Sequence, residues 1–522
     1  GRYLTTGAGN LAIGYEAMKV HTTGARNIAI GYGAMNDTDA GSTSLTSTNN
    51  IFIGYDAGGG TWTDVACTGN TAIGAYAMDA NLNGALYNTA LGLLALGALT
   101  EGDNNVAIGY QSGDALTTGG DNTLIGTETG TNTTAASRLV MIGYGAGRNG
   151  NITTDGSGCI GIGQYALQDL TSGGRNVVIG SYAGKQITTA PDNTLVGNQA
   201  GMDLTFGKEN TFIGSDAGAN ATTASGSTAI GYKAMGAYAT TGIDNTVIGK
   251  QAAQYITSGE KNTILGGNSA GNLIEGRANV SIGHYSMGAI QRYVSDSVAV
   301  GNNSLTYHGA QCVAIGYSAL HGNSTYGGTA AAANHTGSVV VGYQAGSSTT
   351  GSYNTFVGYQ AGKGVSAASG EYNVALGAYA FDSFTSGDDN CIIGRSAGHQ
   401  ISTGDYNVCL GSMAGDNLTT GANNTYLGYN ADCSANSVND EIVLKAGSDT
   451  LVGGGTETIR IGVDSDYIVN DFGENATWTH SSDRRIKIDI KDNTLGLDFI
   501  NKLKTRNFKK KAPSEYPEEF EQ

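Results

Sequence analysis

Residues 210–226 read Asn-Thr-Phe-Ile-Gly-Ser-Asp-Ala-Gly-Ala-Asn-Ala-Thr-Thr-Ala-Ser-Gly, and variants of this stretch fill most of the chain. Its step from an aliphatic residue to glycine recurs 24 times between Gly14 and Gly428, most often 17 residues apart. A fixed period near 20 residues is typical of solenoids, in which each repeat contacts only its neighbours. The sequence therefore predicts an all-β, repetitive β-solenoid or β-roll, and it disfavours most globular enzyme folds.

Within one repeat we expect two short strands. Phe212 and Ile213 favour β-structure, and Gly214 after them indicates a bend or a close approach of another backbone. The third residue after that glycine, Ala217 here, is small in the other repeats too, which predicts a corner or a narrow interior. The second half of the repeat predicts another strand and then a glycine with positive φ. Examples of that half are 22–24, 117–119, 171–173 and 419–421, and longer rim loops are expected at 36–49, 59–69 and 321–337.

Asparagine precedes the repeated glycine by four residues in 18 of 24 repeats. Stacked coils would place these amides in register about 4.8 Å apart. Such a ladder would hydrogen-bond along the axis and satisfy backbone groups of the turns. The alternative, in which the asparagine row binds a ligand, is less economical than this structural role in the turns. The departures from asparagine are Leu139, Cys159, Ser227, Ser297, Cys312 and Ser338.

Composition narrows the class of protein further. The 522 residues include 83 Gly but only 3 Pro, without the three-residue glycine period that collagen needs. The net charge of −17 argues against binding nucleic acid or an anionic membrane surface. No run of 18 apolar residues predicts a membrane span. The six cysteines and seven histidines show no metal-ligand spacing, so no metal or cofactor is expected. We expect the cysteines to be small buried side chains.

A coil of 17 residues with a single apolar pair is a thin unit. Ordering the backbone costs roughly 1–2 kcal/mol per residue. Burial of so little apolar surface offsets only a small part of that cost. We therefore expect several chains to share one core, with three parallel copies turning their isoleucine rows toward a common axis. Because the chain opens inside a repeat, we also expect an attachment region before Gly1.

Tyrosine follows the repeated glycine in ten repeats. If that position faces outward, the rings form an interrupted aromatic stripe suited to sugar rings, whereas stacking between coils is the simpler alternative. The candidate glycan-binding residues are Tyr15, Tyr32, Tyr55, Tyr343 and Tyr359.

The repeat stops after Gly428, which divides the chain into three parts. Residues 1–430 are the expected shaft, and 431–480 a short β-rich neck with strands at 441–444, 457–461 and 466–469. Residues 481–522 form a third segment, in which Leu497, Ile500 and Leu503 have helical spacing.

Two parts of the chain resemble known families. The Asn-x-x-Ile-Gly core of 1–430 resembles the β-roll heads of trimeric autotransporter adhesins, and more closely the repeat regions of phage tail-fibre proteins. The stretch 481–490, Ser-Ser-Asp-Arg-Arg-Ile-Lys-Ile-Asp-Ile, is similar to the opening of the endosialidase-type intramolecular chaperone, a self-cleaving serine peptidase. By its length, 481–522 would be an incomplete domain of that type.

The second resemblance implies a chaperone that trimerises the fibre, guides its folding and then releases itself. Ser482 would be the nucleophile that attacks the carbonyl of Ser481, and Lys487 its base, since a desolvated lysine can activate a hydroxyl. Asp483 and Arg485 match the motif. Without the resemblance, the basic residues Arg484, Arg485 and Lys487 would read as a solvated strand edge.

We therefore expect a structural and adhesive fibre: a homotrimeric phage tail fibre or spike, located in the virion or at a cell surface. Its expected partners are copies of itself, a host glycan or protein receptor, and other virion tail proteins. A bacterial trimeric surface adhesin or extracellular filament is the first alternative. A polysaccharide depolymerase is the second, although no convergent catalytic group is evident. The one reaction expected is autoproteolysis between Ser481 and Ser482.

Overall fold

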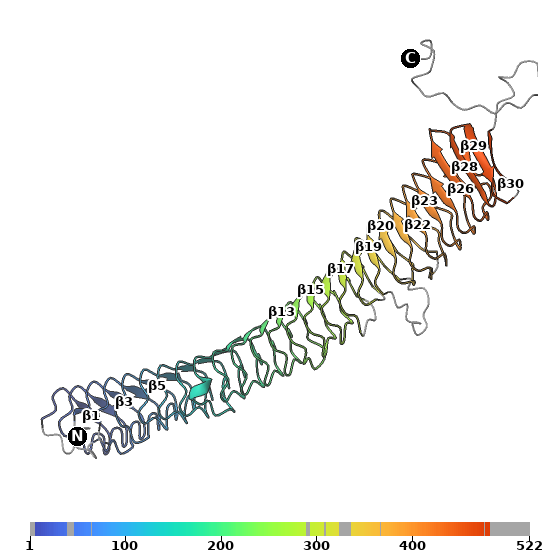
Figure 1. Cartoon of the computed structure of the whole chain (residues 1–522). Coiled ribbons are helices and arrows are strands. Elements are labelled where there is room, and N and C mark those ends of the chain that lie inside the picture. The colour runs from blue at the N-terminus through green and yellow to red at the C-terminus, as the bar shows by residue number, and fades with distance from the viewer. Residues whose placement is uncertain are drawn as a thin grey trace, which may run out of the picture.

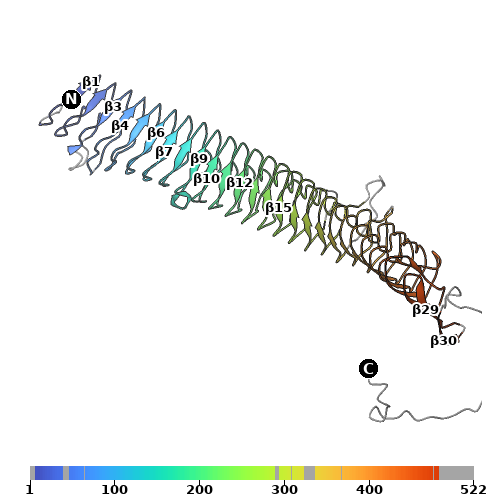
Figure 2. The ribbon, with the colours of Figure 1, turned by 90° about the horizontal axis from the view of Figure 1, so that it is seen from above.

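The computed structural model describes residues 6–38, 46–63, 65–288, 293–306, 309–322, 336–365, 367–473 and the backbone of 475–480. These residues form one long, gently curved rod, with the first and last strands at opposite ends (Figure 1). Seen from above, the strands follow one another along the rod as a single sheet, one strand per coil (Figure 2). The prediction of an all-β solenoid is confirmed.

Each of the 24 repeats supplies one strand of three residues, directly before the repeated glycine. The strands are β1 Leu11–Ile13, β2 Ile28–Ile30, β3 Ile51–Ile53, β4 Thr71–Ile73, β5 Thr89–Leu91, β6 Val106–Ile108, β7 Thr123–Ile125, β8 Val140–Ile142, β9 Ile160–Ile162, β10 Val177–Ile179, β11 Thr194–Val196, β12 Thr211–Ile213, β13 Thr228–Ile230, β14 Thr246–Ile248, β15 Thr263–Leu265, β16 Val280–Ile282, β17 Val298–Val300, β18 Val313–Ile315, β19 Val339–Val341, β20 Thr355–Val357, β21 Val374–Leu376, β22 Cys391–Ile393, β23 Val408–Leu410 and β24 Thr425–Leu427. A short 3₁₀ turn, η2 Thr154–Gly156, lies in the loop between β8 and β9.

Consecutive strands pair in parallel and in register, so equivalent residues form rows along the rod. Phe212 of β12, for example, pairs with Leu195 of β11 and Ala229 of β13. Because side chains alternate across a strand, the middle residue points inward and its two neighbours point outward. Phe212 is fully buried, whereas Ile213 is 37% exposed. The apolar pair of the repeat is therefore divided between the core and the surface.

Two further rows complete the core. The small residue after the glycine, such as Ala217, is buried and confirms the predicted narrow interior. The aliphatic residue three positions before the glycine of the second half is also buried, as at Leu116, Leu204 and Ile401. Each coil thus buries more apolar surface than its strand alone would provide.

The predicted asparagine ladder is present and buried. The side chain of Asn105 donates through Nδ2 to Asn88 Oδ1 at 3.0 Å and to the carbonyl of Gly119 at 2.9 Å. Its own Oδ1 accepts from the backbone and side-chain nitrogens of Asn122 at 3.1 and 2.8 Å. Where serine replaces asparagine, as at Ser227, the hydroxyl still accepts the next backbone N–H, here that of Asn245 at 3.2 Å.

The repeated glycine allows the coils to stack closely. Gly180 has φ of +145°, and a Cβ there would lie 2.1 Å from the carbonyl oxygen of Gly197 in the next coil. No side chain larger than hydrogen fits that space, so the close approach expected after each strand is confirmed.

The second half of the repeat differs from the prediction. Among the described residues, 117–119 and 419–421 form no strand, and Gly119 and Gly421 do not have positive φ. Gly119 is required for a different reason, because its Cβ would lie 2.0 Å from the carbonyl oxygen of Ala136. Left-handed backbone occurs at other positions of the repeat, including non-glycine residues such as Asn104 (φ 56°) and Gln111 (φ 54°).

The parallel sheet continues beyond the last repeat. Strands β26 Ile442–Ala446 and β28 Thr458–Val463 extend it, and the pair β25 Ala431–Asp432 and β27 Leu451–Val452 lies beside them. The chain then reverses, and β29 Asp466–Asp471 and β30 Asn475–His480 pair antiparallel. The three strands expected in 431–480 are confirmed as β26, β28 and β29. The expected helix in 481–522 lies outside the described residues.

Candidate functional site

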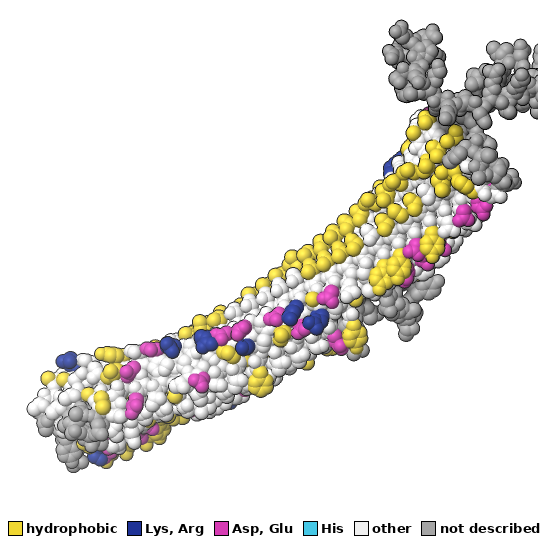
Figure 3. Space-filling view, viewed as in Figure 1, with side chains coloured by type: hydrophobic (Ala, Val, Ile, Leu, Met, Phe, Trp, Pro, Cys, Tyr) yellow, Lys and Arg dark blue, Asp and Glu magenta, His cyan; other side chains and the backbone are white. Residues whose placement is uncertain are grey.

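The most extensive feature of the surface is an apolar strip, which we call the outer rows: the first and third residues of strands β1 to β24. The third residue is always isoleucine, leucine or valine, and the first is aliphatic, threonine or Cys391. Exposure in the third-residue row reaches 52% at Ile13 and 44% at Leu91. Figure 3 shows this apolar line along the upper edge of the rod toward the C-terminal end. No charged side chain interrupts either row.

Tyrosines form a second surface feature, next to the repeated glycine. Tyr15, Tyr32 and Tyr55 stack on successive coils with ring centroids 5.1 and 5.2 Å apart. Tyr343 and Tyr359 stack in the same way at 5.2 Å, with only 6° between their planes. The five candidate glycan-binding tyrosines thus lie in one row and stack between coils, and their paired faces cover one another. A sugar would need an uncovered face, which a continuous stack offers only at its ends.

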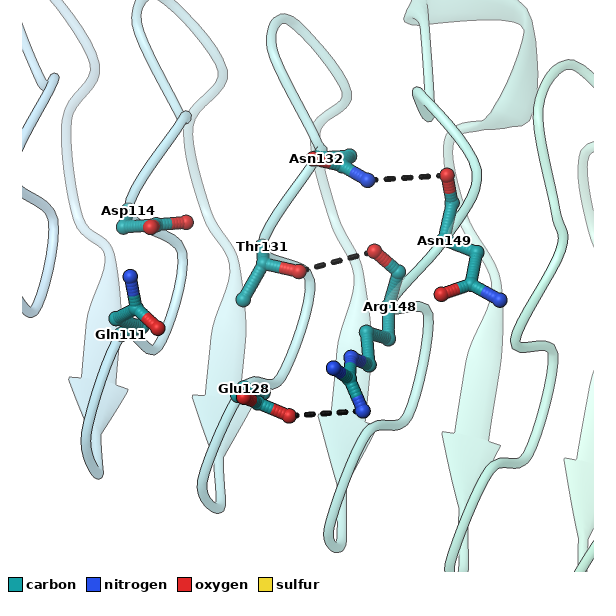
Figure 4. Close-up of a pocket in the computed structure, with 7 residues that line it drawn as sticks. All are labelled: Gln111, Asp114, Glu128, Thr131, Asn132, Arg148 and Asn149. Carbon is teal, nitrogen blue, oxygen red and sulfur yellow. Dashed lines mark hydrogen bonds and ion pairs between the residues drawn. The ribbon is translucent and has the colours of Figure 1, made fainter.

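A polar hollow of about 330 Å³ lies across the coils of β6, β7 and β8 (Figure 4). Glu128 and Arg148 point toward one another from neighbouring coils and form an ion pair of 2.9 Å. Backbone carbonyls anchor two further side chains, since Thr131 Oγ1 donates to Arg148 O at 2.9 Å and Asn132 Nδ2 to Asn149 O at 3.0 Å. The residues that line the hollow are Gln111, Asp114, Glu128, Thr131, Asn132, Arg148 and Asn149.

Two carboxylate oxygens at this hollow, Asp114 Oδ1 and Glu128 Oε2, are buried and accept no hydrogen bond in the structure, although Glu128 Oε2 is ion-paired with Arg148. Partial burial raises the pKa of Asp114, and the charge of Glu128 adds to the effect. The Asp114 carboxylate in the wall of the hollow favours a ligand that donates hydrogen bonds.

The residues of the expected autocleavage site, Ser482, Asp483, Arg485 and Lys487, lie outside the described residues. Five cysteines are buried, including Cys159 and Cys312 in the asparagine row, as expected. Burial raises the pKa of the Cys67 thiol to about 11, which keeps it protonated near neutrality. Cys391 is the exception among the cysteines, because it lies half-buried in the outer rows.

The described residues contain neither a metal-binding cluster nor a membrane-spanning helix. No group of three histidine, cysteine or carboxylate side chains is arranged to hold a metal ion within that part of the chain. Over the same residues, no helix has the length and apolar character needed to cross a membrane. The outer rows, the tyrosine row and the hollow are the candidate functional surfaces described above.

Comparison with known proteins adds no assignment. No protein-family model matches the chain, and no curated protein matches it significantly.

Proposed function

We propose that this chain is the shaft of a homotrimeric structural and adhesive fibre, and that the fibre belongs to a phage tail or tail spike that contacts the host surface. The observation that carries the proposal is the outer rows. Twenty-four rungs at about 4.8 Å, with two outward residues about 7 Å apart, give a strip of roughly 115 Å by 7 Å, or about 800 Å². Exposed apolar patches on monomers rarely exceed a few hundred Å², and about 800 Å² per partner is the standard size of a stable interface.

A second copy of the same chain is the partner that matches this strip best. Both strips repeat with the strand spacing, so their side chains can interdigitate over the whole length only if the partner has the same period. The absence of charge from the rows removes any desolvation penalty for ions at the contact. The number three, and the phage tail in preference to a bacterial adhesin or filament, rest on the sequence resemblance.

The oligomeric state tests this proposal. We expect the full chain to sediment as a trimer and to appear as a thin rod in negatively stained micrographs. Ile179→Lys together with Ile213→Lys places charge in the outer rows and should release folded monomers, because both side chains already face solvent within one chain. The matched control is Ser181→Lys with Ser215→Lys, at half-exposed positions beside the repeated glycine. A monomeric wild-type protein, or equal behaviour of the two double variants, would contradict the proposal.

Cys391 provides an internal reporter of the same contact. Its outward position would place copies of this residue near one another around a common axis. A short thiol-reactive cross-linker should then give covalent dimers of the chain, and Cys391→Ser should abolish them. Monomers alone after treatment of the wild-type protein would argue against parallel, in-register packing.

The maturation step is a separate part of the proposal and rests on the resemblance of 481–490. Ser482 Oγ attacks the carbonyl of Ser481 with Lys487 as base, which replaces the peptide bond by an ester, and water then hydrolyses the ester and releases the segment that begins at Ser482. Intact-mass measurement of the product should give a chain that ends at Ser481. A Ser482→Ala protein that still shortens would refute the assignment of the nucleophile.

A further inference from the structure

The tyrosine row beside the repeated glycine lacks a single ring at one place. Tyr110 and Tyr144 occupy this row on the β6 and β8 coils, and Thr127 occupies it on the β7 coil between them. Elsewhere in the row, tyrosines either follow one another on successive coils or are separated by more than one coil. The arrangement Tyr-x-Tyr over three coils therefore occurs once.

The gap over Thr127 has the dimensions of one flat ring. Neighbouring rings of this row stack at 5.1–5.2 Å where the row is continuous, so rings two coils apart are about 10 Å apart. Within the described part of the chain Tyr110 stacks on no other ring, and it is 43% exposed. Tyr144 contacts Tyr165 edge-on at 5.2 Å on the side away from the gap. Each tyrosine thus has room for a ring on the side of Thr127.

This gap adjoins the polar hollow. Gln111 and Glu128 directly follow Tyr110 and Thr127 in the chain, and both line the hollow. Arg148 Nη1 lies 3.4 Å from the hydroxyl of Tyr144 and 2.9 Å from Glu128 Oε2, which links the aromatic wall to the charged side chains. The two features together form one surface, which we call the Thr127 slot.

We propose that the Thr127 slot binds one neutral pyranose ring of a saccharide, an inference that rests on the adhesive part of the proposed function. The C–H faces of the sugar pack against Tyr110 and Tyr144. Its hydroxyls donate to the carboxylate of Asp114 and accept from the amides of Gln111 and Asn149, of which Asn149 Nδ2 also donates to Asp169 Oδ1 at 2.9 Å.

The charge of the slot favours a neutral ligand. Glu128 already neutralises Arg148, so no free cation remains in the hollow to bind an acidic sugar. Asp114 adds a carboxylate, which would repel a second anion. Amides and carboxylates that converge on a site fix the orientation of a hydroxylated ligand, while the rings supply the apolar contact.

Filling the gap tests the inference without disturbing the fold. Thr127→Tyr places a third ring between those of Tyr110 and Tyr144, in the geometry that the stacks Tyr15–Tyr32–Tyr55 and Tyr317–Tyr343–Tyr359 already adopt. The matched control is Ser215→Tyr, at the same position of the β12 coil. Binding is measured by saturation-transfer-difference NMR on the full chain. The probes are the methyl pyranosides of glucose, galactose, mannose and N-acetylglucosamine at millimolar concentration.

We expect transfer to at least one pyranoside in the wild-type protein and in Ser215→Tyr, and its loss in Thr127→Tyr. Asp114→Asn should weaken binding of the same pyranoside about tenfold, equivalent to about 1.4 kcal/mol. No transfer to any pyranoside, equal transfer in Thr127→Tyr, or transfer only to phenol added as an aromatic control would overturn the inference. Thr127→Tyr should sediment as the wild-type protein does, so failure of the slot is distinguishable from failure of the trimeric fibre.

Discussion

Removal of one amide from the asparagine ladder should loosen the rod at a known place. In Asn105→Ala, the backbone N–H of residue 105 still donates to Asn88 Oδ1, because that bond of 2.9 Å does not involve the lost side chain. The backbone N–H of Asn122 loses its acceptor, and the carbonyl of Gly119 loses its side-chain donor. Asn122 Nδ2 retains its bond of 3.0 Å to the carbonyl of Ala136.

The cost follows from the two backbone groups left without partners. Asn122 and Gly119 are both buried, and a buried polar group that loses its partner costs about 1–3 kcal/mol. The expected loss is therefore about 2–6 kcal/mol, confined to the coils of β6 and β7, since coils of a solenoid interact mainly with their neighbours.

Hydrogen exchange measured by mass spectrometry suits a local loss of this kind. Peptides that contain Asn122 should exchange at least about 30-fold faster in Asn105→Ala, since each 1.4 kcal/mol is a factor of ten. Peptides from β20 to β22 serve as an internal reference and should not change. In Asn105→Ser, the exchange rate of these peptides should lie between the rates in Asn105→Ala and in the wild-type protein, because Ser227 shows that a hydroxyl in this row can accept the next N–H. Equal protection of Asn105→Ala and Asn105→Ser would refute the reasoning.

Two further perturbations test the packing and the electrostatics of the shaft. Gly180→Ala should cost about 2–6 kcal/mol, from left-handed backbone and a Cβ placed 2.1 Å from a carbonyl oxygen, as measured by denaturation. Gly158→Ala, whose Cβ would meet no atom within 4 Å, should cost only the backbone strain of about 1–3 kcal/mol, and an equal loss in both would contradict the steric argument. Burial, with the charge of Asp56, raises the pKa of Asp79 to about 6 from 3.8, so the folded state binds the proton more tightly than the unfolded state does. Stability should therefore fall as the pH rises from about 4 to 6, by about 1 kcal/mol after allowance for solvent screening, and thermal melts of Asp79→Asn should lack this decrease.

Much of the structure of one coil could be predicted, because the sequence features that determine it either act locally or recur in every repeat. Phe212 and Ile213 have strand propensity, Gly214 indicates close backbone approach, and the recurrence of asparagine at one phase predicts a ladder as soon as the coils are stacked. The neck strands β26, β28 and β29 were likewise recognisable from their own composition.

Other features depend on the neighbouring coil and were not predicted. The sequence predicts a turn with positive φ at Gly119, whereas the structure shows that the carbonyl of Ala136 in the next coil excludes a side chain there. Gln111 carries left-handed backbone although nothing in its residue type indicates it. The polar hollow combines Asp114, Glu128 and Arg148 from three coils, at positions that vary between repeats and therefore leave no periodic signal.

The sequence by itself determined the period, the strand in each coil and the asparagine row, because a pattern that recurs every 17 or so residues must stack on itself. The tertiary structure alone decided which half of each apolar pair faces outward, and which side chains of successive coils meet. The physical reason is that a strand of three residues has two faces. Only the closure of the coil around Phe212 and Ala217 assigns one face to the core and leaves Ile213 and its equivalents on the surface as the outer rows.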